Sequence, residues 1–168
     1  GKDADWYSSL AGNSVFSKVS VAGMSFEENI LFTHWGLSGP AILQISSYWR
    51  PGQEITIDLL PNFNLDNLIK QERQYGGKRL VSQLLNDYFS RKLVDALGKF
   101  LALDTKIASL SKADAKLIVD TIHRFKVKPA GDKGYDKAEV MRGGVSTEEL
   151  HSKSLMSKKV EGLYFGGE

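Results

Sequence analysis

The feature that most constrains the fold is a change of hydrophobic periodicity along the chain. Between residues 64 and 123, apolar residues recur at helical spacing in four segments joined by short polar connections. Asn64 and Ser111 precede the first and last segments, where a side-chain oxygen can cap a helix, and Gly76 and Gly77 end the first one. The pattern predicts four helices, and their short connections favour a compact cluster.

Alternating apolar and polar residues predict strands on both sides of this helical stretch. The predicted strands cover residues 15–22, 30–33, 55–59, 125–129 and 138–141. A turn is predicted at 27–29, and a helix over 41–49 with Pro40 as its first residue. Residues 4–14 are assigned only the turn at their end.

These elements predict an α+β fold. Residues 1–63 and 124–168 are expected to form a β-barrel-like or β-sheet domain built from both ends of the chain, with residues 64–123 as an inserted four-helix subdomain. With 168 residues, 42% of them apolar, the chain can bury a core of this kind.

Composition argues against several classes of function. The chain has no cysteine, which excludes a disulfide framework, a thiolate metal site and a cysteine nucleophile. No histidine pair has the spacing of metal ligands, so no metal site is predicted. No apolar run approaches the roughly 20 residues of a membrane helix, and a cytoplasmic protein without a membrane partner is expected. A net charge of +2 is too mild to argue for a nucleic-acid partner.

Charged residues in the helical stretch allow two interpretations. Basic residues gather near the first two predicted helices, at Lys70, Arg73, Lys78 and Arg79. They could form a nucleic-acid patch, but interspersed acidic residues favour a solvated surface of mixed charge. Asp58 is predicted to point outward from its strand, and His123 and His151 are predicted to be structural or solvated.

The segment from Thr33 to Pro40 is the first candidate site. Its two glycines, a serine and a predicted helix start could present backbone N–H groups to a carboxylate or phosphate, and His34 could carry a proton or orient a ligand. The alternative is a strand-to-helix turn that needs glycine for its dihedral angles, and spacing alone favours this plainer interpretation.

The end of the chain is the second candidate site. A glycine pair, Gly143 and Gly144, is followed by an apolar segment that closes on Gly166, Gly167 and Glu168. A strand ending in glycines and a carboxylate allows close approach of a ligand, as in cofactor-binding sheets. No G-x-G-x-x-G turn or P-loop occurs in the sequence, so we interpret it as a piece of a larger protein.

Several motifs, in order, resemble those of the YhiN/BaiN-type bacterial flavoproteins, which are NAD(P)/FAD-dependent oxidoreductases related to aminoacetone oxidase. The motifs are Phe32–Ser46, Ile57–Pro61, Gly143–Val145, Met156–Lys158 and Gly162–Glu168. The resemblance runs from about Ala11 to Glu168. It implies a split FAD-binding Rossmann-like domain carrying an inserted β domain and helical subdomain, with residues 155–168 returning toward the FAD domain.

The resemblance also implies site residues. Gly143, Gly144, Gly167 and Glu168 match positions that contact the cofactor. The segment from His34 to Pro40 matches the signature turn of the family's inserted domain, which we place at the substrate side. His34 is the candidate catalytic residue there, and Gly36, Ser38 and Gly39 are further substrate-side candidates. Arg142 is a further substrate-side candidate. It departs from the family pattern, and near a flavin it could alter the preference for substrate charge or simply face solvent.

The expected function is therefore the substrate-side, flavin-covering insert of an FAD-dependent oxidoreductase. FAD, with NAD(P)H as a candidate reductant, is expected in the full-length enzyme, whose partners would be its own FAD domain and a small-molecule substrate. This chain by itself is expected neither to bind FAD nor to catalyse the reaction. The alternatives are a protein- or nucleic-acid-interaction module in the helical subdomain, and an insert that only stabilises the fold or the oligomer.

Overall fold

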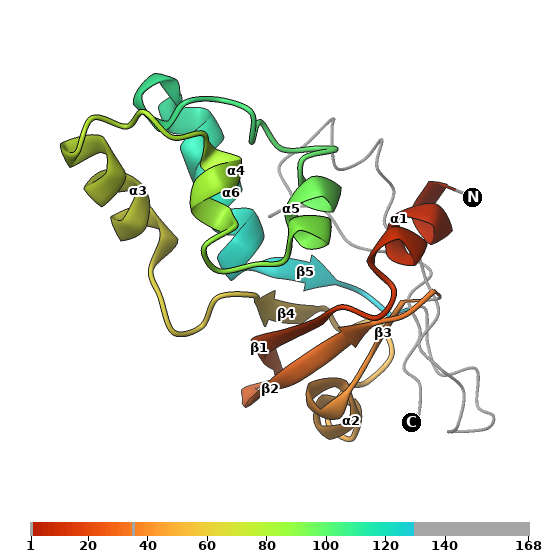
Figure 1. Ribbon diagram of the computed structural model, residues 1–168. Helices are drawn as coiled ribbons and strands as arrows, with labels where there is room; N and C mark the ends of the chain where they lie inside the picture. The colour runs from red at the N-terminus through yellow and green to blue at the C-terminus, as the bar shows by residue number, and fades with distance from the viewer. Residues whose placement is uncertain (1, 35, 130–168) are drawn as a thin grey trace.

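The computed structural model describes residues 2–34 and 36–129, and it confirms the α+β class (Figure 1). The first half holds α1 (Lys2–Leu10), β1 (Ser14–Val21), β2 (Met24–Phe32), β3 (Leu37–Ser38), α2 (Pro40–Ser46) and β4 (Ile55–Asp58). The second half holds α3 (Leu65–Gln74), α4 (Val81–Leu85), α5 (Arg91–Leu97), a 3-10 helix (Ile107–Ser109), α6 (Lys112–His123) and β5 (Phe125–Val127). The predicted strand at 138–141 lies outside the described residues.

The strands form one five-stranded sheet in the order β3-β2-β1-β4-β5, and every neighbouring pair is antiparallel. The edge strand β5 follows the helical stretch, yet it pairs with β4, which precedes that stretch, with Ile57 opposite Phe125. The prediction that both sides of the helical stretch contribute strands to one sheet is therefore confirmed.

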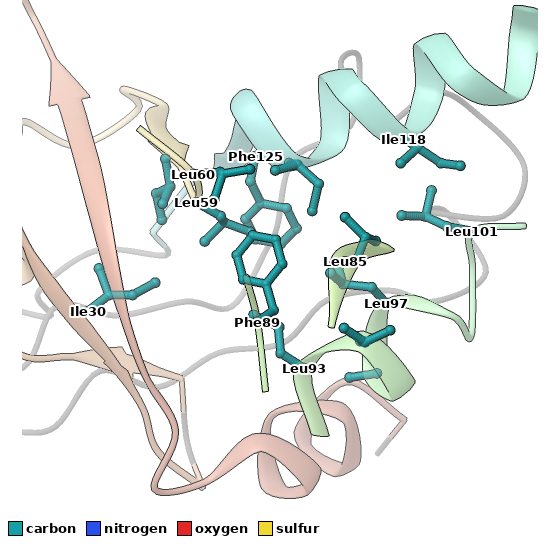
Figure 2. Packing of buried hydrophobic residues seen from close by; sticks show 14 of the residues in the cluster. Ile30, Leu59, Leu60, Leu85, Phe89, Leu93, Leu97, Leu101, Ile118 and Phe125 are labelled. Atoms are coloured by element: carbon teal, nitrogen blue, oxygen red, sulfur yellow. The ribbon is translucent and has the colours of Figure 1, made fainter. Parts of the chain in front are cut away.

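One face of the sheet is buried because apolar residues occupy alternate positions of its strands. The buried positions include Val19, Val21, Ile30, Phe32, Ile55, Ile57, Phe125 and Val127. Most of the intervening residues are polar and at least partly accessible to solvent, such as Ser20 and Thr56, although Leu31 is apolar. Figure 2 shows Ile30 and Phe125 of the sheet together with Leu85, Leu93 and Leu97 of the helices, all of which belong to one buried cluster.

The hairpin of β1 and β2 differs from the prediction. Its turn lies at Ala22 and Gly23, with φ angles of 51° and 81°, as in the two-residue turns that suit hairpin twist. The predicted turn at 27–29 is wrong, because these residues pair with Phe16, Ser17 and Lys18 inside the ladder. Short β3 pairs only with the end of β2, so most of β2 is an edge strand, where polar side chains are well tolerated.

Helix α1 has no counterpart in the sequence-based prediction. Its buried face consists of Trp6, Tyr7 and Leu10. The Trp6 indole Nε1–H donates a hydrogen bond of 2.9 Å to the Ala96 carbonyl of α5, and its ring lies edge-on to Phe32. Helix α1 therefore joins β2 to the helical part of the chain.

The predicted helix starts are confirmed. Asn64 Oδ1 accepts a 3.0 Å hydrogen bond from the Asn67 N–H, and Ser111 Oγ accepts one of 3.0 Å from the Asp114 N–H. Gly77 follows α3 with φ +60°, and a Cβ there would lie 2.7 Å from the Ala108 nitrogen. Only glycine fits this approach, so α3 ends where the sequence indicates.

Candidate functional site

The signature turn at 33–40 leads from β2 through β3 to α2. The Thr33 N–H donates to the Gly36 carbonyl at 2.9 Å, and the Gly36 N–H donates to Thr33 Oγ1 at 3.1 Å. His34 is exposed, with its Nδ1 3.1 Å from Ser8 Oγ on α1. The turn is thus closed by its own hydrogen bonds, and the His34 ring lies at the surface beside α1.

Gly39 has a structural reason to be glycine. Its φ is +97°, and a Cβ there would lie 2.9 Å from the Leu31 nitrogen of β2. Ser38 beside it is fully buried, and its Oγ has no hydrogen-bond partner among the described residues. Helix α2 begins at Pro40, as predicted, and is short. Close packing of the turn on β2 supports the plainer interpretation, and a substrate-side role for the turn stays a prediction.

Five further candidates lie outside the described residues. They are the cofactor-binding candidates Gly143, Gly144, Gly167 and Glu168 and the substrate-side candidate Arg142. Their roles therefore stay predictions from the resemblance.

His123 joins three elements through hydrogen bonds. Its Nε2 accepts from the Leu65 N–H at the start of α3 at 3.0 Å, and its Nδ1 lies 2.8 Å from Asp58 Oδ1 at the end of β4. Because Nε2 is an acceptor, the neutral ring carries its proton on Nδ1 and donates it to Asp58. The structural role predicted for His123 is confirmed. Asp58 alternates outward from the buried Ile57, as predicted, but its side chain is only 26% exposed and its carboxylate lies against His123 at the end of α6.

The basic cluster near α3 and α4 is largely compensated. Arg79 bonds Glu72 at 2.6 Å and Asp87 at 2.9 Å, and these hydrogen bonds raise the pKa of its guanidinium above the usual value. Arg73 donates to the carbonyls of Ile107 and Leu110, which fixes α3 on the 3-10 segment. The predicted surface of mixed charge is therefore confirmed for this cluster.

A hollow that the sequence-based reasoning missed lies between the start of β1, the β4–α3 connection and the α4–α5 connection. Its volume is about 220 Å³. Three aromatic side chains that are accessible to solvent line it: Phe16, Phe63 and Tyr88. The buried residues Leu59, Leu60 and Phe89 also line it, and Figure 2 shows them as members of the buried hydrophobic cluster. We call this hollow, with its three aromatic walls, the aromatic groove.

The aromatic walls remain accessible to solvent. Phe16 is 42% exposed and Phe63 is 49% exposed, although most large apolar side chains of the described residues are buried. The Phe63 and Tyr88 rings lie 4.8 Å apart between centroids and are tilted by 58°. A signal was present in the sequence, because Phe16 stands at an outward position of its strand and Phe63 directly precedes a helix cap.

Other classes of site find no support in the described part of the chain. No group of three or more His, Cys, Asp or Glu side chains could hold a metal ion there. Among the helices at residues 2–34 and 36–129, none combines the length and apolar character needed to cross a membrane.

Comparison with known proteins places the chain in a family. Residues 2–140 match the model described as HI0933-like protein barrel and H2TH domain. A ribosomal RNA dihydrouridine synthase of Haemophilus influenzae is 43% identical over 150 residues, which cover 89% of this chain and 37% of that protein. A protein of the same name from Escherichia coli is 40% identical over 161 residues, or 95% of this chain and 40% of that protein.

A more distant relative has a different name. The 3-dehydro-bile acid delta(4,6)-reductase of Clostridium scindens is 24% identical over 147 residues, 81% of this chain and 36% of that enzyme. The chain thus spans less than half the length of each of these relatives. The matches confirm the resemblance to a flavoprotein family at the level of this domain. The chain belongs to the HI0933-like family and carries its barrel and H2TH domain.

Proposed function

We propose that this chain is the RNA-binding, substrate-side domain of a flavin-dependent enzyme that reduces uridine to dihydrouridine in ribosomal RNA. The observation that carries the proposal is the identity of 40–43% to two ribosomal RNA dihydrouridine synthases over 89–95% of the chain. RNA takes the place of the small-molecule substrate expected from sequence. The proposal also combines the expected oxidoreductase with the alternative of a nucleic-acid module.

The reaction needs both RNA binding and hydride transfer, and we assign these two tasks to different parts of the protein. Forming dihydrouridine adds two hydrogens across the C5–C6 double bond of uridine, which requires a hydride donor such as a reduced flavin. The cofactor-contacting positions implied by the resemblance, Gly143, Gly144, Gly167 and Glu168, lie outside the described residues. The aromatic groove, at about 220 Å³, is below the roughly 300–1,000 Å³ typical of ligand pockets. We therefore assign binding and positioning of the RNA to this chain, and hydride transfer to the FAD domain.

The charge distribution indicates how RNA would be held. Much of the basic cluster on α3 and α4 is bonded to acidic side chains or carbonyls, so phosphate attraction alone gives little affinity there. Specific recognition of RNA commonly targets unpaired bases that stack on aromatic side chains. A weakly charged domain with exposed aromatic rings suits recognition of an unpaired segment better than binding along a duplex.

The direct test uses the full-length protein that carries this chain, loaded with FAD and supplied with NADH or NADPH. Its substrate is ribosomal RNA from cells that lack dihydrouridine in that RNA, and the product is measured by mass spectrometry of digested nucleosides. We expect dihydrouridine to appear at a defined position and free uridine to remain unreduced. Reduced flavin that never forms dihydrouridine in ribosomal RNA would refute the proposal.

A second experiment tests whether FAD binding requires the part of the protein outside this chain. FAD is titrated by fluorescence quenching against the full-length protein and against this chain. We expect saturable binding by the full-length protein alone. Stoichiometric binding by this chain would show that it forms its own flavin site.

A further inference from the structure

We propose that the aromatic groove is the subsite where one unpaired base of the RNA stacks. The inference rests on the proposed function, because that function supplies RNA as the ligand. It goes further by naming the residues that receive the base, Phe16, Phe63 and Tyr88, and none of them was among the candidates found from sequence.

The shape of the groove suits a single planar ring. Its buried apolar lining includes Leu59, Leu60 and Phe89, each less than 10% exposed, and these residues attach the groove to the core. The tilted pair of Phe63 and Tyr88 leaves half of the Phe63 surface open to a ligand. A volume of about 220 Å³ is below the roughly 300 Å³ lower bound of common ligand pockets, so one base fits better than a whole dinucleotide.

The polar atoms of the groove suit the edge of a base. Ser14 and Asn62 are exposed lining residues, and each side chain offers both a hydrogen-bond donor and an acceptor. Ser90 also lines the groove, but its Oγ donates to Asn13 Oδ1 at 2.7 Å and accepts from the Leu93 N–H, so it serves the fold. Polar edge groups beside aromatic faces are the usual elements of single-stranded RNA recognition.

Charges around the groove suit a phosphate backbone passing along its rim. Exposed Arg91 and Lys92 directly follow Ser90, and exposed Lys18 follows Phe16 by two residues on the same face of β1. Glu27 stands opposite Lys18 in the ladder and offsets part of its charge. The Asp58 carboxylate, opposite Lys18 on β4, is already bonded to His123 and to the Leu60 N–H.

The test compares aromatic variants of the full-length, flavin-loaded protein. The probe is a labelled single-stranded RNA copy of the segment that contains the modified uridine, and binding is followed by fluorescence anisotropy. Phe63→Ala and Phe16→Ala should each weaken binding roughly 5- to 150-fold, the range that follows from about 1–3 kcal/mol per stacked base. Phe63→Tyr keeps an aromatic face and should bind nearly as well as the unchanged protein.

Tyr75→Ala is the matched control. Tyr75 is 85% exposed and follows α3, whereas Phe63 precedes it, so the two differ in position by about 15 Å along the helix axis. Its removal should leave RNA affinity unchanged. Equal effects of Tyr75→Ala and Phe63→Ala, or no effect of Phe63→Ala, would overturn the inference.

Further readouts separate this inference from its alternatives. Loss of bound flavin in Phe63→Ala would show that the groove packs against another part of the protein, which also overturns the inference. If the unchanged protein makes dihydrouridine while Phe63→Ala binds RNA normally, only the inference fails. If Phe63→Ala loses RNA affinity but the unchanged protein makes no dihydrouridine, the proposed reaction fails and the subsite stands.

Discussion

Replacing His123 with alanine tests how the helical part of the chain is attached to the sheet. The imidazole is 19% exposed and connects Leu65 at the start of α3 with Asp58 at the end of β4. His123→Ala removes both hydrogen bonds at once. It leaves the Leu65 N–H without its acceptor, while Asp58 keeps the hydrogen bond from the Leu60 N–H at 2.9 Å.

The expected loss follows from the two contacts. A neutral hydrogen bond such as that from Leu65 contributes about 0.5–1.5 kcal/mol, and one to a charged group such as Asp58 about 1.5–3 kcal/mol. Both side chains are partly exposed, so water replaces some of the lost interaction. We therefore expect the free energy of unfolding to fall by about 2–3 kcal/mol, which corresponds to roughly 4–12 °C in Tm for a chain of this size.

The assay is urea unfolding of this chain, followed by tryptophan fluorescence, with His34→Ala as the control. The His34 ring is exposed, and among the described residues its side chain makes one hydrogen bond, with Ser8, so its removal should change the unfolding free energy by less than about 0.5 kcal/mol. Nitrogen NMR of the unchanged protein at neutral pH should also find the His123 proton on Nδ1. A His123→Ala loss no larger than that of His34→Ala would refute the bridging role.

Three further changes probe single positions. Ala22→Asn should raise the unfolding free energy in urea by about 0.5–1 kcal/mol, because alanine is strained at φ 51° whereas Asn-Gly suits this hairpin turn; an unchanged urea midpoint would contradict this. Gly39→Ala should lower Tm by more than about 5 °C, because its Cβ would press on the backbone of β2 at φ +97°; a normal melting curve would show that the turn can move away. Burial opposes ionisation of Asp120, but hydrogen bonds from Lys116 and Arg124 outweigh it and lower the carboxyl pKa below 3.8. Asp120 therefore stabilises the fold above about pH 4 and loses this effect as pH falls through its folded pKa. Asp120→Asn should thus cost about 1 kcal/mol at pH 7 and progressively less as pH falls below 4 in urea titrations; a cost independent of pH would count against it.

The elements predicted well are those with a local signal. The alternation around Val19 and Ile57 specifies buried strand faces, and the caps at Asn64 and Ser111 are formed by their own side chains. Such signals depend on neighbours in sequence, so they can be recognised without the tertiary structure.

The elements missed depend on distant contacts. Helix α1 has three large apolar residues within nine positions, and it is stabilised by contacts such as that between Trp6 and Ala96, 90 residues away. The polar residues at 27–29 become a strand only because β1 supplies the ladder. Tertiary packing thus overrides weak local preference in both cases.

The candidate site was predictable only in part. The signature turn and the chain end stand out because glycines cluster there. The aromatic groove combines Phe16, Phe63 and Tyr88 from three separate segments, and no spacing in the sequence indicates that they meet. Likewise, the strand pattern that places Asp58 outward contains no information about its contact with His123 at the end of α6.

The position of β5 at the edge beside β4 has a consequence for the order of folding. Pairing Ile57 with Phe125 closes a loop of about 70 residues, which costs roughly 3 kcal/mol more than closing a two-residue hairpin such as that of β1 and β2. We expect folding of α3 to α6 to bring the two ends together before β5 pairs. We therefore expect β5 amides to gain protection from hydrogen exchange late, together with α6, after the hairpin of β1 and β2 has formed.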